Sequence, residues 1–245
     1  MGLTVSNVTT ASSITLDATL NITGVSADVG DMLVVMIASD NSATSGTSPI
    51  SSISDSSGNT WNQRVNRNRT TGNTVDDGVS IRSYTSAITS ALSSGDITIL
   101  FNTDTSSKAA LVKKVSADPG EAIVYIGNGG GDGYSGTPSV STTVNEGQTI
   151  IAFIGIETRS AVTADSDTTN GSWSTQQSTR ADQGGSLRSI RIASQYKTVT
   201  ATGTQEYNPT STSTDWSAGW MKFYFSAAQG FGALLNGLRN RLVIS

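Results

Sequence analysis

Three aspartates lie in segments typical of turns, where a carboxylate could bind a cation. Asp55 precedes Trp61, and Asp167 precedes Trp173, with Asp165 two residues earlier. Carboxylate oxygens, together with backbone carbonyls, are the ligands that Ca²⁺ prefers in proteins. A single carboxylate that accepts hydrogen bonds from the backbone following it would also explain the neighbouring Gly and Asn residues, and it needs no metal. We favour this turn cap, so neither a metal nor another cofactor is expected.

Acid–base chemistry has few other candidates in this sequence. The chain has no His and no Cys, which removes the commonest general base, the commonest zinc ligand and any thiol nucleophile. Two carboxylates facing one cleft could hydrolyse a glycoside, and the nearest pairs are Asp76 with Asp77 and Asp165 with Asp167. Adjacent residues of a strand point to opposite faces, and paired carboxylates in loops are usually solvated. We therefore expect no catalytic residues and no enzyme, with a glycosidase as the least favoured alternative.

The composition indicates an all-β protein. Charged residues make up 14% of the 245-residue chain, while apolar residues make up 36% and fall in regularly spaced clusters. Thr, Val and Ile are plentiful and the helix formers Glu and Lys are scarce, so local propensity favours strands. The net charge of −4 offers no basic face to nucleic acid. No run approaches the roughly 20 apolar residues that span a bilayer, and Met1–Leu20 lacks the pattern of a secretory signal.

One apolar stretch occurs twice. Gly30–Ala38 is a polar turn followed by an unbroken apolar run, and Gly147–Ile156 repeats it. Because neither run alternates, each is predicted to be a central strand covered on both faces. Further landmarks follow both copies in the same order, namely Ser54–Trp61 with Ser166–Trp173, Ile81-Arg82 with Ile190-Arg191, and Ser116-Ala117 with Ser226-Ala227. The chain is therefore expected to be one unit made twice.

Each predicted unit has seven or eight short strands separated by turns, which is typical of a β-sandwich of Ig-like or jelly-roll type. We expect a first sandwich over residues 1–118, a second over 119–228 and a C-terminal tail over 229–245. Each unit is long enough to hold its own core, but the two could equally pack into one body. Alternating apolar residues predict an early strand with one buried face, made of Ile14, Leu16, Ala18, Leu20 and Ile22.

Residues 127–133, Gly-Asn-Gly-Gly-Gly-Asp-Gly, are the most glycine-dense stretch and are expected to form a surface loop. They lack the Gly-Lys-Ser/Thr of a phosphate-binding loop. From this loop Asp132 and Tyr134 could contact a glycan or a neighbouring subunit. Trp216 and Trp220 could line a sugar-binding platform. Residues four apart on a strand share a face, however, so we favour a place for both in the second core.

The end of the chain differs from the rest. Nothing after the first unit corresponds to residues 229–245. Apolar residues recur in this tail at helical spacing, although its glycines weaken a helix by roughly 1 kcal/mol each. So much apolar surface must be buried, either against the chain's own sandwich or by docking onto a neighbouring subunit. The expected docking residues are Phe231, Leu234, Leu235, Leu238 and Leu242.

One segment resembles a known class of protein. Gly30-Asp31 with its apolar strand, followed by Ile50-Ser51-Ser52-Ile53-Ser54-Asp55-Ser56-Ser57-Gly58-Asn59-Thr60-Trp61, is similar to β-sandwich structural proteins of tailed bacteriophages and to related modules of bacterial surface proteins. The resemblance covers residues 30–61 and, more loosely, the second copy. It implies a virion component, either a capsid decoration or cement protein or a tail or baseplate protein. It supplies no catalytic residues.

These features predict a non-enzymatic virion structural protein that decorates or stabilises a capsid. Low charge and an apolar tail suit a repetitive assembly in which neighbours clamp each copy. The expected partners are other virion proteins, such as the major capsid protein, or copies of the chain itself in a homo-oligomer, without nucleic acid or membrane. The expected location is the virion, assembled in the host cytoplasm. A tail or fibre module that recognises a host through surface glycan is the alternative.

Overall fold

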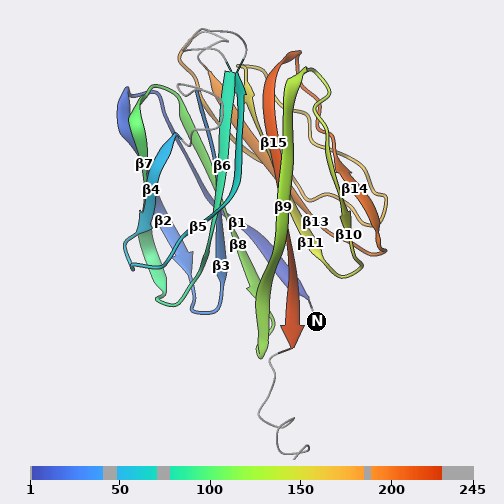
Figure 1. Ribbon diagram of the computed structural model, residues 1–245. Coiled ribbons are helices and arrows are strands. Elements are labelled where there is room, and N and C mark those ends of the chain that lie inside the picture. Colours follow the sequence, from blue (N-terminus) through green and yellow to red (C-terminus); the bar gives the residue numbers. More distant parts are fainter. Residues whose placement is uncertain (1, 41–48, 71–77, 185–188, 228–245) are drawn as a thin grey trace, which may run out of the picture.

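The computed structural model describes residues 2–40, 49–70, 78–184 and 189–227 (Figure 1). This part of the chain forms fifteen β-strands and no helix, which confirms the all-β prediction. Residues 229–245, with the docking residues expected there, and the pair Asp76 and Asp77 lie outside the described residues. The strands are β1 (Leu3–Ser13), β2 (Asp17–Ala27), β3 (Met32–Asp40), β4 (Ile50–Asp55), β5 (Asn62–Thr70), β6 (Gly78–Ala87), β7 (Leu92–Thr105), β8 (Lys108–Ala117), β9 (Glu121–Ser135), β10 (Val140–Val144), β11 (Thr149–Glu157), β12 (Gln177–Ala181), β13 (Ile190–Thr198), β14 (Gly203–Tyr207) and β15 (Thr214–Ala227).

Each half of the chain is a nested series of antiparallel strand pairs. In the first half β1 pairs with β8, β2 with β7 and β3 with β6. In the second half β9 pairs with β15, β10 with β14 and β11 with β13. Pairing of the first strand with the last, and so on inward, describes a long hairpin folded over into two sheets. Each unit is therefore a sandwich of the jelly-roll type rather than the Ig-like type.

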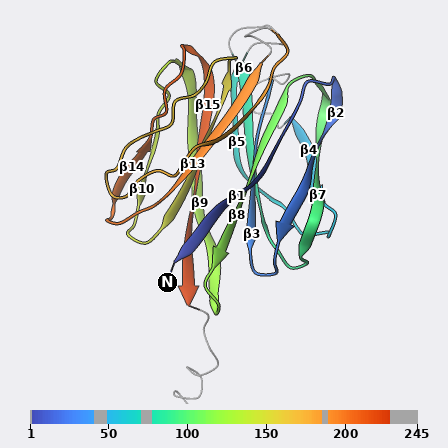
Figure 2. The ribbon, with the colours of Figure 1, turned by 180° about the vertical axis from the view of Figure 1, so that it is seen from behind.

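The sheets of the two units are equivalent. The five-stranded sheet of the first unit has the order β1-β8-β3-β6-β5, and that of the second has the order β9-β15-β11-β13-β12. Smaller sheets, β2-β7-β4 and β10-β14, cover their outer faces (Figures 1 and 2). An isolated bridge between Thr163 and Thr210 lies where the first unit pairs β4 with β7. The chain is thus a duplicated sandwich, as its repeated apolar run predicts.

The equivalence extends to single hydrogen bonds, and these correct the alignment of two predicted landmarks. Gly30 N donates to Ile88 O in the first unit, and Gly147 N donates to Val199 O in the second. With the central strands so aligned, Arg82 of β6 corresponds to Ala193 of β13 and not to Arg191. The two closing Ser-Ala pairs are likewise displaced by two residues, because bulges and loops differ in length between the units.

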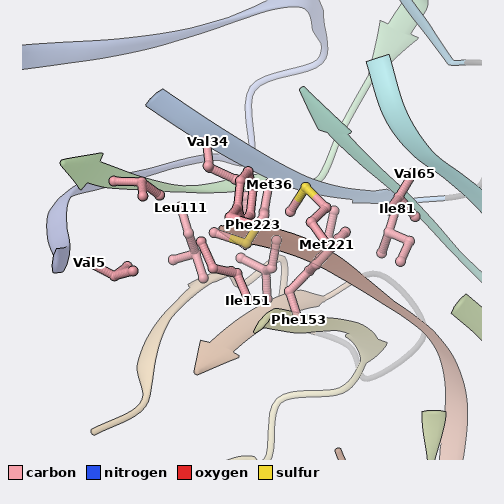
Figure 3. Close-up of a cluster of buried hydrophobic side chains, with 14 of the residues drawn as sticks. Val5, Val34, Met36, Val65, Ile81, Leu111, Ile151, Phe153, Met221 and Phe223 are labelled. Atoms are coloured by element: carbon pink, nitrogen blue, oxygen red, sulfur yellow. The ribbon is translucent and has the colours of Figure 1, made fainter. Parts of the chain in front are cut away.

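The central strands β3 and β11 are buried along their whole length, which confirms the predicted cover on both faces. Alternate residues of each strand enter two different cores. Leu33, Val35 and Ile37 face the small sheet of the first unit. Met32, Val34, Met36 and Ala38 instead face the second unit, where they meet Ile151 and Phe153 of β11 in a shared apolar layer (Figure 3). The two sandwiches therefore form one body with four sheets in layers.

The shared layer is reciprocal. β1 packs on β12, and the equivalent strands β9 and β5 pack on each other, as in a two-fold symmetric dimer. At its centre β3 and β11 approach closely through small side chains. A Cβ added at Gly155 of β11 would lie 3.0 Å from Cβ of Ala38 and 2.5 Å from Cγ2 of Ile81. Gly155 is thus required by the close approach of the second unit to the first.

Two predicted segments differ from the structure. β2 begins only at Asp17, so Leu20 and Ile22 are buried as predicted, but Ile14 and Leu16 are 53% and 68% exposed in the connection between β1 and β2. They leave the buried face because the chain turns there from one sheet to the other. The predicted glycine loop over residues 127–133 is wrong, since these residues lie inside β9 and pair with β15.

We expect the change Gly155→Ala to lower the free energy of unfolding by about 1–3 kcal/mol, because a methyl group here overpacks the layer between the units. Gly127→Ala is the matched control in β9, where an added Cβ meets only Cε of Lys222 at 3.8 Å. This control should change stability little or raise it slightly. Urea unfolding of the two variants measures the difference. Equal effects would show that the layer has room at Gly155.

Candidate functional site

Asp55 caps the turn between β4 and β5. Its Oδ1 accepts hydrogen bonds from Ser57 N at 2.9 Å and Asn59 N at 3.3 Å. Its Oδ2 accepts a hydrogen bond from Nε1 of Trp61 at 2.8 Å. The carboxylate therefore fixes both the turn and the aromatic residue that follows it, which confirms the turn-cap interpretation for Asp55.

Asp165 and Asp167 are engaged in the same manner in the second unit. Asp165 accepts from Asp167 N at 2.8 Å and from Asn208 N at 2.9 Å. Asp167 accepts from Thr169 N at 2.9 Å and from Nζ of Lys197 at 3.2 Å. The hydrogen bond from Thr169 N, aided by the Lys197 ammonium, lowers the pKa of Asp167. These carboxylates bind the chain itself, and no group of three or more His, Cys, Asp or Glu lies together in the described residues.

The two equivalent turns fix their tryptophans differently. Trp61 is only partly buried and donates to Asp55, as above. Trp173 is 8% exposed and enters the second core, where its ring lies 5.2 Å from that of Tyr207. Nζ of Lys197 lies 5.5 Å from the Trp173 ring, which replaces the direct bond to a carboxylate with a cation–π contact. The predicted match of the two turns is therefore correct in position but not in contacts.

A buried cation lies between the two units. Lys113 of β8 is fully buried, and its Nζ donates to the side-chain oxygens of Asn7, on β1, and Gln177, on β12. The ring of Tyr196, on β13, lies 5.7 Å from the same Nζ. Burial lowers the pKa of Lys113 to about 8. Neutral groups of both units thus bind the ammonium of Lys113. Its burial in the shared apolar layer disfavours the charged form of the side chain.

Strand β5 is tied to the second unit by its arginines. Nε of Arg69 donates to Oδ1 of Asp215 at 3.0 Å. The guanidinium carbon of Arg64 lies 4.0 Å from the ring centroid of Tyr125, on β9. These polar contacts border the shared apolar layer, so they align the two units rather than form a reactive centre.

Trp216 and Trp220 of β15 lie across the glycines of β9. Trp216 is 8% exposed, and Trp220 packs at the margin of the same core. A Cβ added at Gly129 would lie 2.5 Å from Cζ2 of Trp220, and one at Gly133 would lie 2.9 Å from Cζ2 of Trp216. The second core is thus confirmed as the place of both side chains. The sugar-platform alternative is wrong for Trp216, because its ring is covered.

The remaining surface candidates lie on the opposite face of β9. Asp132 and Asn128 are exposed, and Tyr134 is 63% exposed. Ile126, which is 37% exposed, lies at the register shift that precedes the regular stretch of this strand. β9 is the outermost strand of its sheet and, within the described chain, pairs only with β15 (Figure 1). We call residues 126–135 the β9 edge. Exposed side chains and the outward backbone groups of an edge strand together form a surface that can bind another polypeptide strand.

Reasoning from the sequence placed Asp132 and Tyr134 on the surface but missed the β9 edge. The glycines indicated a loop because glycine weakens strands. The available signal was the pair of tryptophans four apart in β15. Large rings on one strand favour glycine on its neighbour, because the rings occupy the space over the adjacent strand.

We expect Asp55→Ala to lower the free energy of unfolding by about 2–3 kcal/mol, because several hydrogen bonds to one carboxylate are lost. Asp104→Ala, at an exposed position of β7, is the control and should have little effect. Calcium chloride or a chelator should leave the thermal midpoint of the wild-type chain unchanged. A midpoint that rises with calcium concentration would instead indicate binding to the folded chain.

The pKa of Lys113 predicts a specific pH dependence of stability. Because the folded-state pKa of about 8 lies below the ordinary value of 10.5, the unfolded chain binds the proton more tightly. The free energy of unfolding should therefore rise with pH between about 8 and 10.5, by about 3 kcal/mol in total. Lys113→Met lacks this contribution. Urea unfolding gives the free energy of unfolding of the wild-type and Lys113→Met proteins at each pH. The difference between the two should grow by about 3 kcal/mol between about pH 8 and pH 10.5. Two profiles that stay parallel over this interval would contradict the prediction.

Comparison of the chain with protein-family models, with curated proteins and with solved structures gave no match. A search of the described residues for a helix long and apolar enough to cross a membrane found none. The chain's own residues and their geometry therefore carry the functional proposal.

Proposed function

We propose that this chain is a non-enzymatic structural protein of a virion, which decorates or stabilises a capsid through subunit contacts. The observation that carries the proposal is the apolar tail sequence. The buried clusters of both sandwiches and of the layer between them are formed by residues between Val5 and Phe223. The apolar residues at helical spacing come after these, from Phe231 to Leu242. A tail of this composition after such a body suits an anchor to a neighbouring subunit.

The fold supports this role by analogy. Jelly rolls recur in viral capsid and lectin domains, but a shared fold does not by itself imply a shared function. The resemblance of residues 30–61 to sandwiches of tailed phages points in the same direction. In this chain the segment builds the Asp55 cap that holds Trp61.

The packing of the two units supports a mechanical role. The two units share one apolar layer, and β3 and β11 are buried on both of their faces. The Arg69–Asp215 pair adds a polar contact at the margin of this layer. A body joined in this way keeps its shape when neighbours in an assembly load it.

We expect deletion of residues 229–245 to abolish incorporation of the chain into virus particles while leaving its body folded. Particles purified by density gradient from cells that supply the full-length or shortened chain would be compared by quantitative mass spectrometry. Circular dichroism and thermal unfolding of the shortened chain would establish that it still folds.

The matched variants change the tail without shortening it. Replacing Phe231, Leu234, Leu235, Leu238 and Leu242 by Ser should act like the deletion. Replacing Gln229, Asn236 and Asn240 by Ser should leave incorporation unchanged. If the shortened chain is incorporated as efficiently as the full chain, the tail is not the anchor, and absence of the wild-type chain from particles would overturn the proposed function itself.

A further inference from the structure

We propose that the β9 edge pairs in antiparallel fashion with the β9 edge of a second copy of this chain, about a two-fold axis at Gly130. The pairing names a second copy of the chain as a partner for the structural role proposed above. Only the biological meaning of the pairing rests on that role. The geometry that points to it is local. It consists of an exposed edge strand whose sequence is symmetric about one residue.

The β9 edge carries few of the features that protect other edges. Proteins block edge strands with charges, prolines, bulges or short length. Asp132 is the single charged residue among residues 126–135, and β9 contains no proline. Its only register shift lies near Ile126, so pairing with β15 is regular from Gly127 to Ser135.

The other edge strands of the two large sheets are blocked. β5 carries Arg64, Arg67 and Arg69. β12 has five residues and includes Arg180. β1 has a register shift between Asn7 and Thr9, and the carbonyl of Thr9 already accepts a hydrogen bond from Gln177 at 3.1 Å. Among the edges of the two large sheets, β9 therefore offers the longest regular stretch, with Asp132 as its single charge.

The sequence of this edge is symmetric. Residues 127–133 read Gly-Asn-Gly-Gly-Gly-Asp-Gly, so inversion about Gly130 exchanges glycine with glycine and Asn128 with Asp132. In an antiparallel pair centred on Gly130, Asn128 of each copy lies opposite Asp132 of the other. Nδ2 of Asn128 donates one hydrogen bond to Oη of Tyr125, and its second N–H then faces a carboxylate acceptor at both positions. A strand that is complementary to itself favours a second copy over an unrelated partner.

The flanking residues fit the same axis. Inversion about Gly130 brings Gly127 of one copy opposite Gly133 of the other, so Tyr134 lies near the register shift at Ile126 of the second copy. Ile126 and Tyr134 are two of the large apolar side chains exposed on the described surface, at 37% and 63%. The opposite face of the strand is formed by glycines beneath Trp216 and Trp220, so no side chain of β9 on that face hinders a neighbouring strand. Pairing would cover exposed apolar surface and the free backbone edge together.

The register can be tested by disulfide trapping in the full-length chain, which has no native cysteine. The Asn128→Cys and Asp132→Cys chains are purified separately, mixed, and oxidised with glutathione disulfide. In the proposed register these positions lie opposite each other, within the reach of a disulfide. Two copies of position 128 lie roughly 13 Å apart along the strands, beyond that reach.

A covalent dimer is therefore expected in the mixture but not in either chain alone. The Asn145→Cys chain, mixed with the Asp132→Cys chain, measures cross-linking by random collision at an exposed turn. The proposal is overturned if the mixture yields no more dimer than this control, or if each single variant cross-links with itself as efficiently.

Sedimentation equilibrium provides an independent measurement without cysteine. Asn128→Asp puts like charges opposite each other twice and should weaken dimerisation about tenfold. Asn145→Asp makes the same chemical change at the exposed turn and should leave dimerisation unchanged. Adding Asp132→Lys to the Asn128→Asp chain should restore the dimer, because opposite charges then face each other. A wild-type chain that stays monomeric at its highest soluble concentration would refute the pairing. Because purified chain is used without particles, such a failure is distinct from failure of the tail deletion.

Discussion

The apolar layer between the two five-stranded sheets is the constraint on which the rest of the molecule depends. It forces β3 and β11 to be apolar on both faces, since one face serves each unit's own core and the other serves the partner unit. Close approach of these strands requires small residues at Ala38 and Gly155. Neither sandwich could keep this face in water without exposing a large apolar surface. The duplication is therefore one folded body and not two domains in tandem.

Polar groups in and around this layer fix its geometry at some cost in stability. An apolar interface alone tolerates sliding, because the hydrophobic effect has no direction. Lys113 can be buried only where Asn7 and Gln177 present their oxygens, and these come from different units. The Arg69–Asp215 pair similarly joins β5 to β15. Such contacts set one relative position of the sheets, while the apolar side chains supply most of the favourable free energy.

The fold could be predicted where the sequence pattern has a single physical cause. Unbroken apolar runs at Met32–Ala38 and Ile150–Ile156 required burial on both faces, and both are central strands. A glycine-rich segment, by contrast, can arise for several physical reasons. In residues 127–133 it reflects the rings of Trp216 and Trp220 on the adjacent strand, a tertiary contact that no local pattern shows. The turn at Asp55 was predictable because its hydrogen bonds are local, whereas the ammonium of Lys197 reaches Asp167 from a distant strand.

The reciprocal packing also explains where the two units were free to diverge. Both faces of each large sheet are used, one by the small sheet and the other by the partner unit. Of the two large sheets, only the edges remain for new contacts. β1 and β9 are equivalent edges, yet the carbonyl of Thr9 in β1 is bonded by Gln177 of the second unit. The equivalent strand β9 instead gained glycines on one face and exposed polar and aromatic residues on the other. Since a core strand could not accept such a sequence without losing packing, these differences fall at an edge of the sheet.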